Sequence, residues 1–194
     1  TRGEVVRIET GLSRDLEDTW FCMRASQQDM SVYIEDQLVT EYTTKDTRLF
    51  GENSASAYVF FKVEDEDAGK TLAIELVSDS EFSGFLNKVY VGEKSDIVNA
   101  LVNQCIGVIF CSLYMLILSS MVVILGCILR VVYRKNVDIT YLGLGIMLLS
   151  LSMTTESHVR QFFLPNVSIA SHVGFLLTIL IPYPFIVYVS RLQK

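Results

Sequence analysis

Residues 97–129, IVNALVNQCIGVIFCSLYMLILSSMVVILGCIL, form a run of thirty-three residues without a charged side chain, and this run decides the fold. Its core, Ile106–Leu129, holds fourteen Leu, Ile, Val or Phe residues among twenty-four. A helix of that length extends about 36 Å, more than the roughly 30 Å of hydrocarbon in a bilayer. A surface helix of a soluble protein needs a polar face, and this run has none. We therefore expect a transmembrane helix.

Two further apolar runs follow, Ile139–Met153 and Ile169–Val189. Together the three runs predict spans at about residues 104–129, 138–155 and 169–190. Pro182 and Pro184 should kink the third span or end its regular hydrogen bonding, because proline has no backbone N–H.

Small and capping residues refine these helices. Gly143 and Gly145 would allow a neighbouring helix to approach the second span closely. Ser95 is the expected N-cap of the first helix, and Asp96 would lie in its first turn, where the helix dipole favours a negative charge.

Basic residues predict the orientation. Arg130, Arg134 and Lys135 follow the first run, Arg191 and Lys194 follow the third, and only Arg160 lies between the second and third. The positive-inside rule therefore places residues 1–96 outside the cell membrane and the loop 130–137 and the C-terminus in the cytoplasm.

The chain before the first run differs in composition from the chain after it. Residues 1–96 carry ten Lys or Arg and twenty Asp or Glu, a net charge of −10, whereas residues 97–194 carry six and two, a net charge of +4. Apolar and polar residues alternate with period two in the first part, which is typical of half-buried strands. The expected strands are Val5–Glu9, Thr19–Ala25, Met30–Ile34, Leu38–Tyr42, Val59–Val63, Leu72–Val77 and Asn87–Val91.

Turn signals separate these strands. Glu35–Gln37 is the expected hairpin turn, and the acidic stretch Glu64–Gly69 is an expected solvated loop, too irregular in spacing for a calcium site. The fold class is therefore mixed: an antiparallel β-sandwich of the jelly-roll kind over residues 1–94, then a transmembrane α-helical bundle over residues 95–194.

The order of these parts resembles a known family. RLFG at 48–51, the strand Ser56–Val63, DAGK at 67–70 and the stretch RQFFLPN at 160–166 occur in this order. This resembles bacterial seven-transmembrane receptors with diverse intracellular signalling modules, of the kind that end in a GGDEF diguanylate cyclase domain. The resemblance implies a galactose-binding-like sensory jelly roll, four more spans, a cytoplasmic output domain and a homodimer.

The ends of the chain agree with that expectation. The chain begins with Thr1 instead of methionine, and it stops five residues after the third apolar run. We expect it to be part of a longer protein that continues in both directions.

No catalytic pattern accompanies the membrane segment. The only histidines are His158 and His172, and the sequence has no zinc-ligand spacing, phosphate-binding glycine loop or nucleophile elbow. We expect no enzyme active site, cofactor, metal or nucleic-acid partner within these residues. Cys22, the one cysteine before the first span, is expected to be a small buried residue and not a reactive thiol.

Aromatic and arginine side chains of the outer domain are the candidate ligand contacts: Trp20, Tyr33, Arg48 and Tyr58, with Tyr42 as a further aromatic of the same kind. Aromatic rings stack on sugars and guanidinium groups donate hydrogen bonds to them, so a small ligand of the saccharide class is expected. The same rings could instead fill or cover the sandwich.

Glu156, His158 and Arg160 cluster at the outer end of the second span. Ionisable groups at this depth are costly and tend to be paired, so the three could form a pH-sensitive latch. The alternative, which we favour, is an ion pair of Glu156 with Arg160 that ends the helix at the membrane interface.

These observations predict a signal-transduction receptor whose outer sandwich passes a ligand signal through the lipid-embedded helices. The chain between Val91 and Ser95 is short, so movement of the sandwich should move the first helix directly. The alternatives are a transporter or transport accessory with an outer substrate-binding domain, and an anchored binding module without an output. The spans carry few ionisable residues, which argues against transport.

Overall fold

The computed structural model describes residues 3–16, 18–49, 51–79, 85–134, 138–157, 160–164 and 166–193. The chain forms two compact units. One contains Thr1–Val102 together with Gln161–Ile169, and the other contains Asn103–Arg160 and Ala170–Lys194. His158, of the expected latch, lies outside the described residues.

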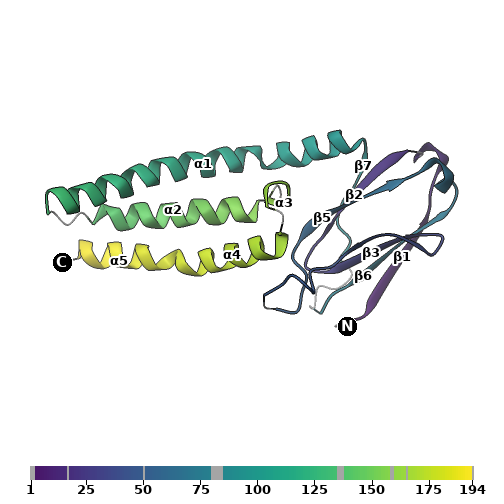
Figure 1. The fold of residues 1–194 in the computed structure, drawn as a ribbon, viewed down its shortest axis with the longest axis horizontal. Coiled ribbons are helices and arrows are strands. Elements are labelled where there is room, and N and C mark those ends of the chain that lie inside the picture. The colour runs from purple at the N-terminus through teal and green to yellow at the C-terminus, as the bar shows by residue number, and fades with distance from the viewer. Residues whose placement is uncertain are drawn as a thin grey trace. The chain divides into compact units, whose positions relative to one another are not determined.

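The first unit is a β-sandwich of two antiparallel sheets (Figure 1). A four-stranded sheet has the order β1-β6-β3-β4 and a three-stranded sheet has the order β5-β2-β7. The strands are β1 Val5–Gly11, β2 Thr19–Ala25, β3 Asp29–Ile34, β4 Gln37–Tyr42, β5 Ala57–Val63, β6 Thr71–Val77 and β7 Val89–Gly92. Each of the seven expected strands is confirmed, with bounds shifted by at most two residues, as is the fold class of a sandwich followed by helices.

The core of the sandwich lies between the two sheets and comes from the alternating positions. Met30, Val32 and Ile34 of β3 are buried there, as are Val59 and Val63 of β5. Full burial of an aliphatic side chain of this size stabilises the fold by roughly 1.5–3 kcal/mol. Because both sheets contribute one face to one cluster, the period-two pattern of the sequence is the direct cause of the two-layer fold.

The hairpin between β3 and β4 turns at Glu35 and Asp36, as expected. Their φ angles are 47° and 64°, so both residues adopt the left-handed conformation. Two consecutive left-handed residues form the type I′ turn that matches the twist of a hairpin, a turn in which glycine or asparagine is usual. Gln37 already belongs to β4.

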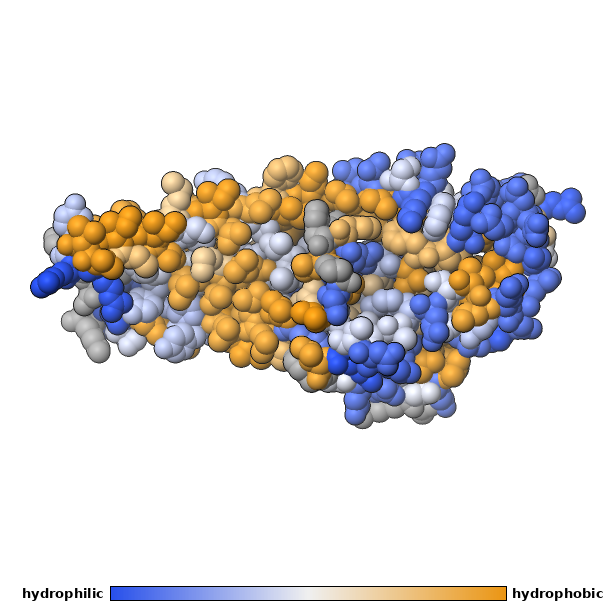
Figure 2. Space-filling model, in the orientation of Figure 1, coloured by the Kyte–Doolittle hydropathy of each residue, from blue (hydrophilic) through white to orange (hydrophobic). Residues whose placement is uncertain are grey.

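The second unit is formed by helices. α1 is Lys94–Val132, of which residues 103–132 belong to this unit, and α2 is Ile139–Glu156. α4 is Val167–Leu180, of which residues 170–180 belong to this unit, and α5 is Pro182–Leu192. Three helical segments, Lys94–Val132, Ile139–Glu156 and Val167–Leu192, are long and apolar enough to cross a membrane. Figure 2 shows apolar residues gathered over these helices, and Val131 and Phe110 of α1 are 78% and 66% exposed. Such surfaces suit contact with lipid, so the chain is a multi-pass membrane protein.

The third segment is interrupted where proline was expected to interrupt it. α4 ends at Leu180 and α5 begins at Pro182. The N–H of Ile181 still donates to the carbonyl of Leu177 over 3.1 Å. The interruption therefore starts at Pro182, whose nitrogen carries no hydrogen.

α2 lies between α1 and the segment formed by α4 and α5 (Figure 1), and two of its glycines are close to these neighbours. A Cβ atom at Gly143 would lie 3.0 Å from Cγ1 of Val122 in α1, and one at Gly145 would lie 2.9 Å from the ring of Phe185 in α5. The close approach expected at these glycines is confirmed.

Hydroxyl groups add hydrogen bonds from α2 to α1 and to α4. Ser152 of α2 and Thr178 of α4 are joined over 3.0 Å, and Thr154 of α2 donates to Ser112 of α1 over 3.2 Å. Small and hydroxyl-bearing residues are the usual contacts between helices in lipid, where apolar burial gives little driving force.

Candidate functional site

The three-stranded sheet is buried on its second face as well as on its core face. Cys22 of β2 points away from the sandwich core and is fully buried, together with Ile97 and Leu101 from the first turns of α1. Four aromatic side chains of the same sheet surround this cluster: Trp20, Tyr58, Phe60 and Tyr90. We call this set the outer-face cluster. It lies wholly within the sandwich unit.

Cys22 behaves as the sequence indicated. Burial removes water from the thiol, disfavours the thiolate and raises the pKa of Cys22 to about 12. Because the thiolate is the reactive form, this side chain serves packing.

The link from the sheet to α1 is one residue long. β7 ends at Gly92 and α1 begins at Lys94, which leaves only Glu93 between them. The carbonyl of Glu93 accepts hydrogen bonds from the N–H groups of Asp96 and Ile97, over 3.1 Å and 3.0 Å. The expectation that Ser95 caps the helix was wrong, because the helix has already begun one residue earlier.

Lys94 ties this first turn to the aromatic side chains. Its Nζ lies 4.4 Å from the ring centre of Trp20 and 5.9 Å from that of Phe60. A lysine at this distance is attracted to the negative face of the ring by about 0.5–1 kcal/mol at an exposed position. The start of α1 is therefore held by the apolar packing of Ile97 and Leu101 and by the cation–π contact of Lys94 with Trp20.

A second segment binds the edge of the same sheet. β5 is an edge strand, and the side-chain amide of Gln161 pairs with its backbone at Tyr58. Oε1 of Gln161 accepts from the Tyr58 N–H over 2.7 Å, and Nε2 donates to the Tyr58 carbonyl over 3.3 Å. The amide thus takes the place of a neighbouring strand at this residue.

Phe162 extends the contact made by Gln161. Its ring meets the ring of Phe60 edge to face, with the ring centres 6.5 Å apart. Both residues belong to the short helix α3, Arg160–Phe163, which lies between α2 and α4 in the chain. The three-stranded sheet therefore contacts two separate segments: one is the start of α1 itself, and the other is followed by α4 after a short connection.

The structure does not bring the four expected ligand contacts together. Trp20 and Tyr58 belong to the outer-face cluster, and Tyr58 meets Tyr90 edge to face at 6.4 Å. Tyr33 lies on β3 of the other sheet, with the guanidinium carbon of Arg7 6.0 Å from its ring centre. Arg48 lies between β4 and β5 and donates to the carbonyl of Glu52.

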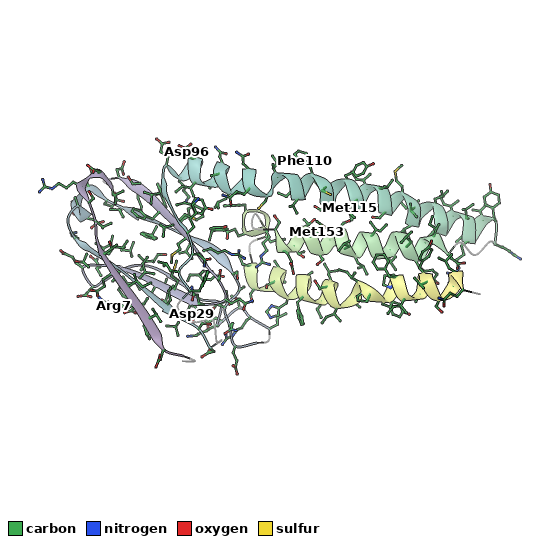
Figure 3. The ribbon with its side chains drawn as sticks, turned by 180° about the vertical axis from the view of Figure 1, so that it is seen from behind. Arg7, Asp29, Asp96, Phe110, Met115 and Met153 are labelled. Carbon is green, nitrogen blue, oxygen red and sulfur yellow. The ribbon has the colours of Figure 1, made fainter. Side chains whose placement is uncertain are left out.

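Arg7 of β1, labelled in Figure 3, lines a charged depression on the outer side of the four-stranded sheet. Its guanidinium contacts Glu9 and Asp36 at 2.7 Å and Glu75 at 3.2 Å. Asp36 is the largest of the causes that raise the pKa of Arg7 above its usual value. The depression has a volume of about 290 Å³ and offers carboxylate acceptors, a guanidinium donor and the nearby Tyr33 ring. These groups suit a hydroxyl-rich ligand.

Another polar cluster, absent from the expected sites, fixes the segment between β4 and β5. Asp29 at the start of β3 accepts a hydrogen bond from Ser54 and pairs with Lys45 over 2.9 Å. Burial by itself would raise the pKa of Asp29, but the hydrogen bonds from Ser54 and Lys45 outweigh it and lower the pKa. Ser54 also accepts from the N–H of Thr44, so the network is structural.

Two of the three residues of the expected latch are described: Glu156 is the last residue of α2, and Arg160 is the first residue of α3. Glu156 is exposed, and Arg160 donates from Nη1 to the carbonyl of Thr155 over 3.1 Å. This bond satisfies one of the last carbonyls of the helix, as a basic residue at a helix end can. Glu156 borders a cleft of about 440 Å³ whose other lining residues are Gln104, Cys105, Val108, Met153 and Ser157.

Comparison of the chain with models of known protein families found no match, and comparison with curated proteins found no relative. The expected receptor family therefore rests on the order of the parts in the sequence.

Proposed function

We propose that the chain is the sensory and membrane-spanning portion of a signal-transduction receptor. In this proposal residues 1–96 face the outside, the loop 130–137 and the C-terminus face the cytoplasm, and the output is a diguanylate cyclase. The basic residues after the first and third apolar runs support the orientation.

The observation that carries the proposal is the double attachment of the three-stranded sheet. Ile97 and Leu101 pack beneath it, and Gln161 and Phe162 bind its edge strand. α1 continues without a break from Lys94 to Val132, and α3 is followed by α4 after a short connection. A shift between strands β2 and β5 would therefore displace the starts of two membrane helices relative to each other.

The proposed stimulus is a small ligand of the saccharide class at the depression around Arg7. A ligand there would compete for the carboxylates that hold β1, β6 and the β3–β4 turn together through Arg7. Such a change need only favour one of two arrangements of the sheets by a few kcal/mol to act as a signal.

Insertion of a flexible Gly-Ser-Gly-Ser segment tests the coupling. The full-length gene product that contains these residues would be expressed in cells carrying a cyclic di-GMP reporter. We expect the insertion between Gly92 and Glu93 to change the cyclic di-GMP level, and the same insertion after Glu66, in the exposed acidic turn, to leave it unchanged. Equal levels for both insertions would contradict the coupling, and a product that never alters cyclic di-GMP would contradict the cyclase output.

A distance measurement tests the same coupling without any output domain. Spin labels at residues 131 and 192, both exposed on their helices, report the distance between the ends of α1 and α5. The insertion after Gly92 should shift or broaden this distance distribution in a variant whose native cysteines have been replaced. An unchanged distribution would show that the sandwich does not act on the helices.

A further inference from the structure

A small pocket lies where the helices α1, α2 and α5 meet, at the end of the bundle where α1 finishes and α2 begins. It has a volume of about 110 Å³. Gly126 and Cys127 of α1, Leu144 of α2 and four polar side chains line it: Arg130, Thr140, Tyr141 and Arg191. All of these residues belong to the helical unit.

The charges around the pocket do not balance. Arg191 pairs with Asp138 over 3.2 Å, and its guanidinium carbon lies 4.6 Å from the ring centre of Tyr141. Within the described part of the chain, Arg130 takes part in no ion pair. Asp138 and Glu156 are the only acidic residues after residue 96, and Glu156 is at the opposite end of α2. The pocket therefore carries a net positive charge.

The other groups at the pocket also favour an anion. Thr140 and Tyr141 bring hydroxyl donors, and they stand in the first turn of α2, which begins at Ile139. The start of a helix carries a partial positive charge and unsatisfied N–H groups. The preceding Asp138 makes no side-chain hydrogen bond to this helix end, because its carboxylate is turned to Arg191.

We propose that this pocket binds the phosphate of an anionic phospholipid headgroup. Two guanidinium groups and two hydroxyl groups match the acceptor oxygens of a phosphate, and arginine binds phosphate through parallel hydrogen bonds. The absence of a side chain at Gly126 lets the Thr140 side chain approach α1 at the edge of the pocket, because a Cβ there would collide with it.

The surroundings of the pocket select a lipid over a soluble anion. Ile128 and Val131 of α1 and Leu192 of α5 are exposed apolar residues beside the pocket-lining arginines in the sequence. Acyl chains would cover such a surface while the headgroup reached the guanidinium groups. In the orientation proposed above, the pocket faces the cytoplasmic leaflet, where polybasic sites meet anionic lipids. This inference does not depend on what the sandwich senses.

Lipid titration followed by native mass spectrometry tests the proposal on the purified chain in detergent. The probes are dioleoylphosphatidylglycerol, zwitterionic dioleoylphosphatidylcholine and inorganic phosphate. We expect phosphatidylglycerol to bind at least about tenfold more tightly than phosphatidylcholine. Both lipids carry the same phosphate, but the choline ammonium of phosphatidylcholine would be repelled by the two guanidinium groups of the pocket. Arg130→Gln should remove that preference, and Arg130→Lys should keep part of it.

Arg134→Gln is the matched control, because it removes the same charge from the same helix end outside the pocket lining. An equal loss in Arg134→Gln and Arg130→Gln would overturn the pocket in favour of diffuse attraction. Complete displacement of phosphatidylglycerol by an equal concentration of inorganic phosphate would overturn the lipid assignment. Equal binding of the two lipids by the native chain would overturn the proposal without the need for any variant.

Discussion

Gln161 forms hydrogen bonds through its side-chain amide with both backbone polar groups of Tyr58, a residue 103 positions earlier in the chain. The bonds close the free edge of the three-stranded sheet with a residue from the segment between two membrane helices.

Replacement of Gln161 should expose the Tyr58 amide. In Gln161→Ala the Tyr58 N–H loses its acceptor. Each lost hydrogen bond should weaken the binding of α3 to β5 by about 0.5–1.5 kcal/mol. Hydrogen–deuterium exchange should show faster exchange at Tyr58 and unchanged exchange in β3 of the other sheet. Gln161→Glu, which keeps an acceptor oxygen, should preserve part of the protection. Unchanged exchange in Gln161→Ala would show that the pairing is absent in solution.

Replacement of Lys94 should alter the environment of Trp20. Trp20 is the only tryptophan of the chain, so tryptophan fluorescence reports on the environment of this one ring. Lys94→Met removes a cation 4.4 Å from the ring, which should shift the emission and lower the free energy of unfolding by about 0.5–1 kcal/mol. Lys88→Met is the control, because Lys88 lies over Tyr90 instead, at 4.9 Å. A larger emission change in the control would contradict the contact.

The stability of the sandwich should fall in acid partly through Asp29. Its pKa is lower in the folded chain than in the unfolded chain. The stabilisation is therefore complete above the unfolded value, about 3.9, and is lost as the pH falls through the folded value. Asp29→Asn should cost about 1–3 kcal/mol near neutral pH, and the difference from the native chain should shrink below about pH 4.

Chemical unfolding of the whole chain in detergent at several pH values measures this effect. Asp46→Asn, an exposed acid in the connection between β4 and β5 that Asp29 helps to hold, is the control and should change stability little. A pH-independent difference between Asp29→Asn and the native chain would mean that packing, and not the charge, is responsible.

Two glycines of α1 should respond to alanine in opposite ways. A Cβ at Gly126 would collide with Thr140, whereas a Cβ at Gly107 would meet nothing within 4 Å. Gly126→Ala should therefore destabilise the helical unit by roughly 1–3 kcal/mol. Gly107→Ala should be neutral or stabilise by up to about 1 kcal/mol, because alanine favours a helix. Thermal unfolding in detergent compares them, and equal melting temperatures would contradict the close packing.

The strands could be predicted because apolar and polar residues alternate along the sequence, as buried and exposed positions alternate along a strand. In β5, Val59, Phe61 and Val63 point to the core while the residues between them point away, and this pattern needs no knowledge of the partner strands. The membrane helices could be predicted equally well, because a helix that crosses the lipid needs an uninterrupted run of apolar residues. In both cases the information is local.

The double attachment of the sheet could not be predicted, because it joins residues that are distant in the chain. Trp20 and Tyr58 alternate with core residues, but the sequence leaves open whether they fill the core of the sandwich or cover its outer side. It gives no sign that the first turns of α1 cover that face. The Ser95 prediction failed for a related reason: a serine before an acidic residue is a good local cap, but β7 runs almost directly into the helix. Glu93 then takes the capping position.

The single-residue link at Glu93 has a consequence for how such a chain can change over evolution. An α-helix turns about 100° per residue, so one residue added or removed inside α1, between Leu101 and Ile106, would turn the whole following helix by that angle while its first turns stayed fixed. A substitution in this stretch changes one side chain, whereas an insertion or deletion rotates the whole following part of the helix. We therefore expect the number of residues in this stretch to vary less among related chains than the identity of those residues.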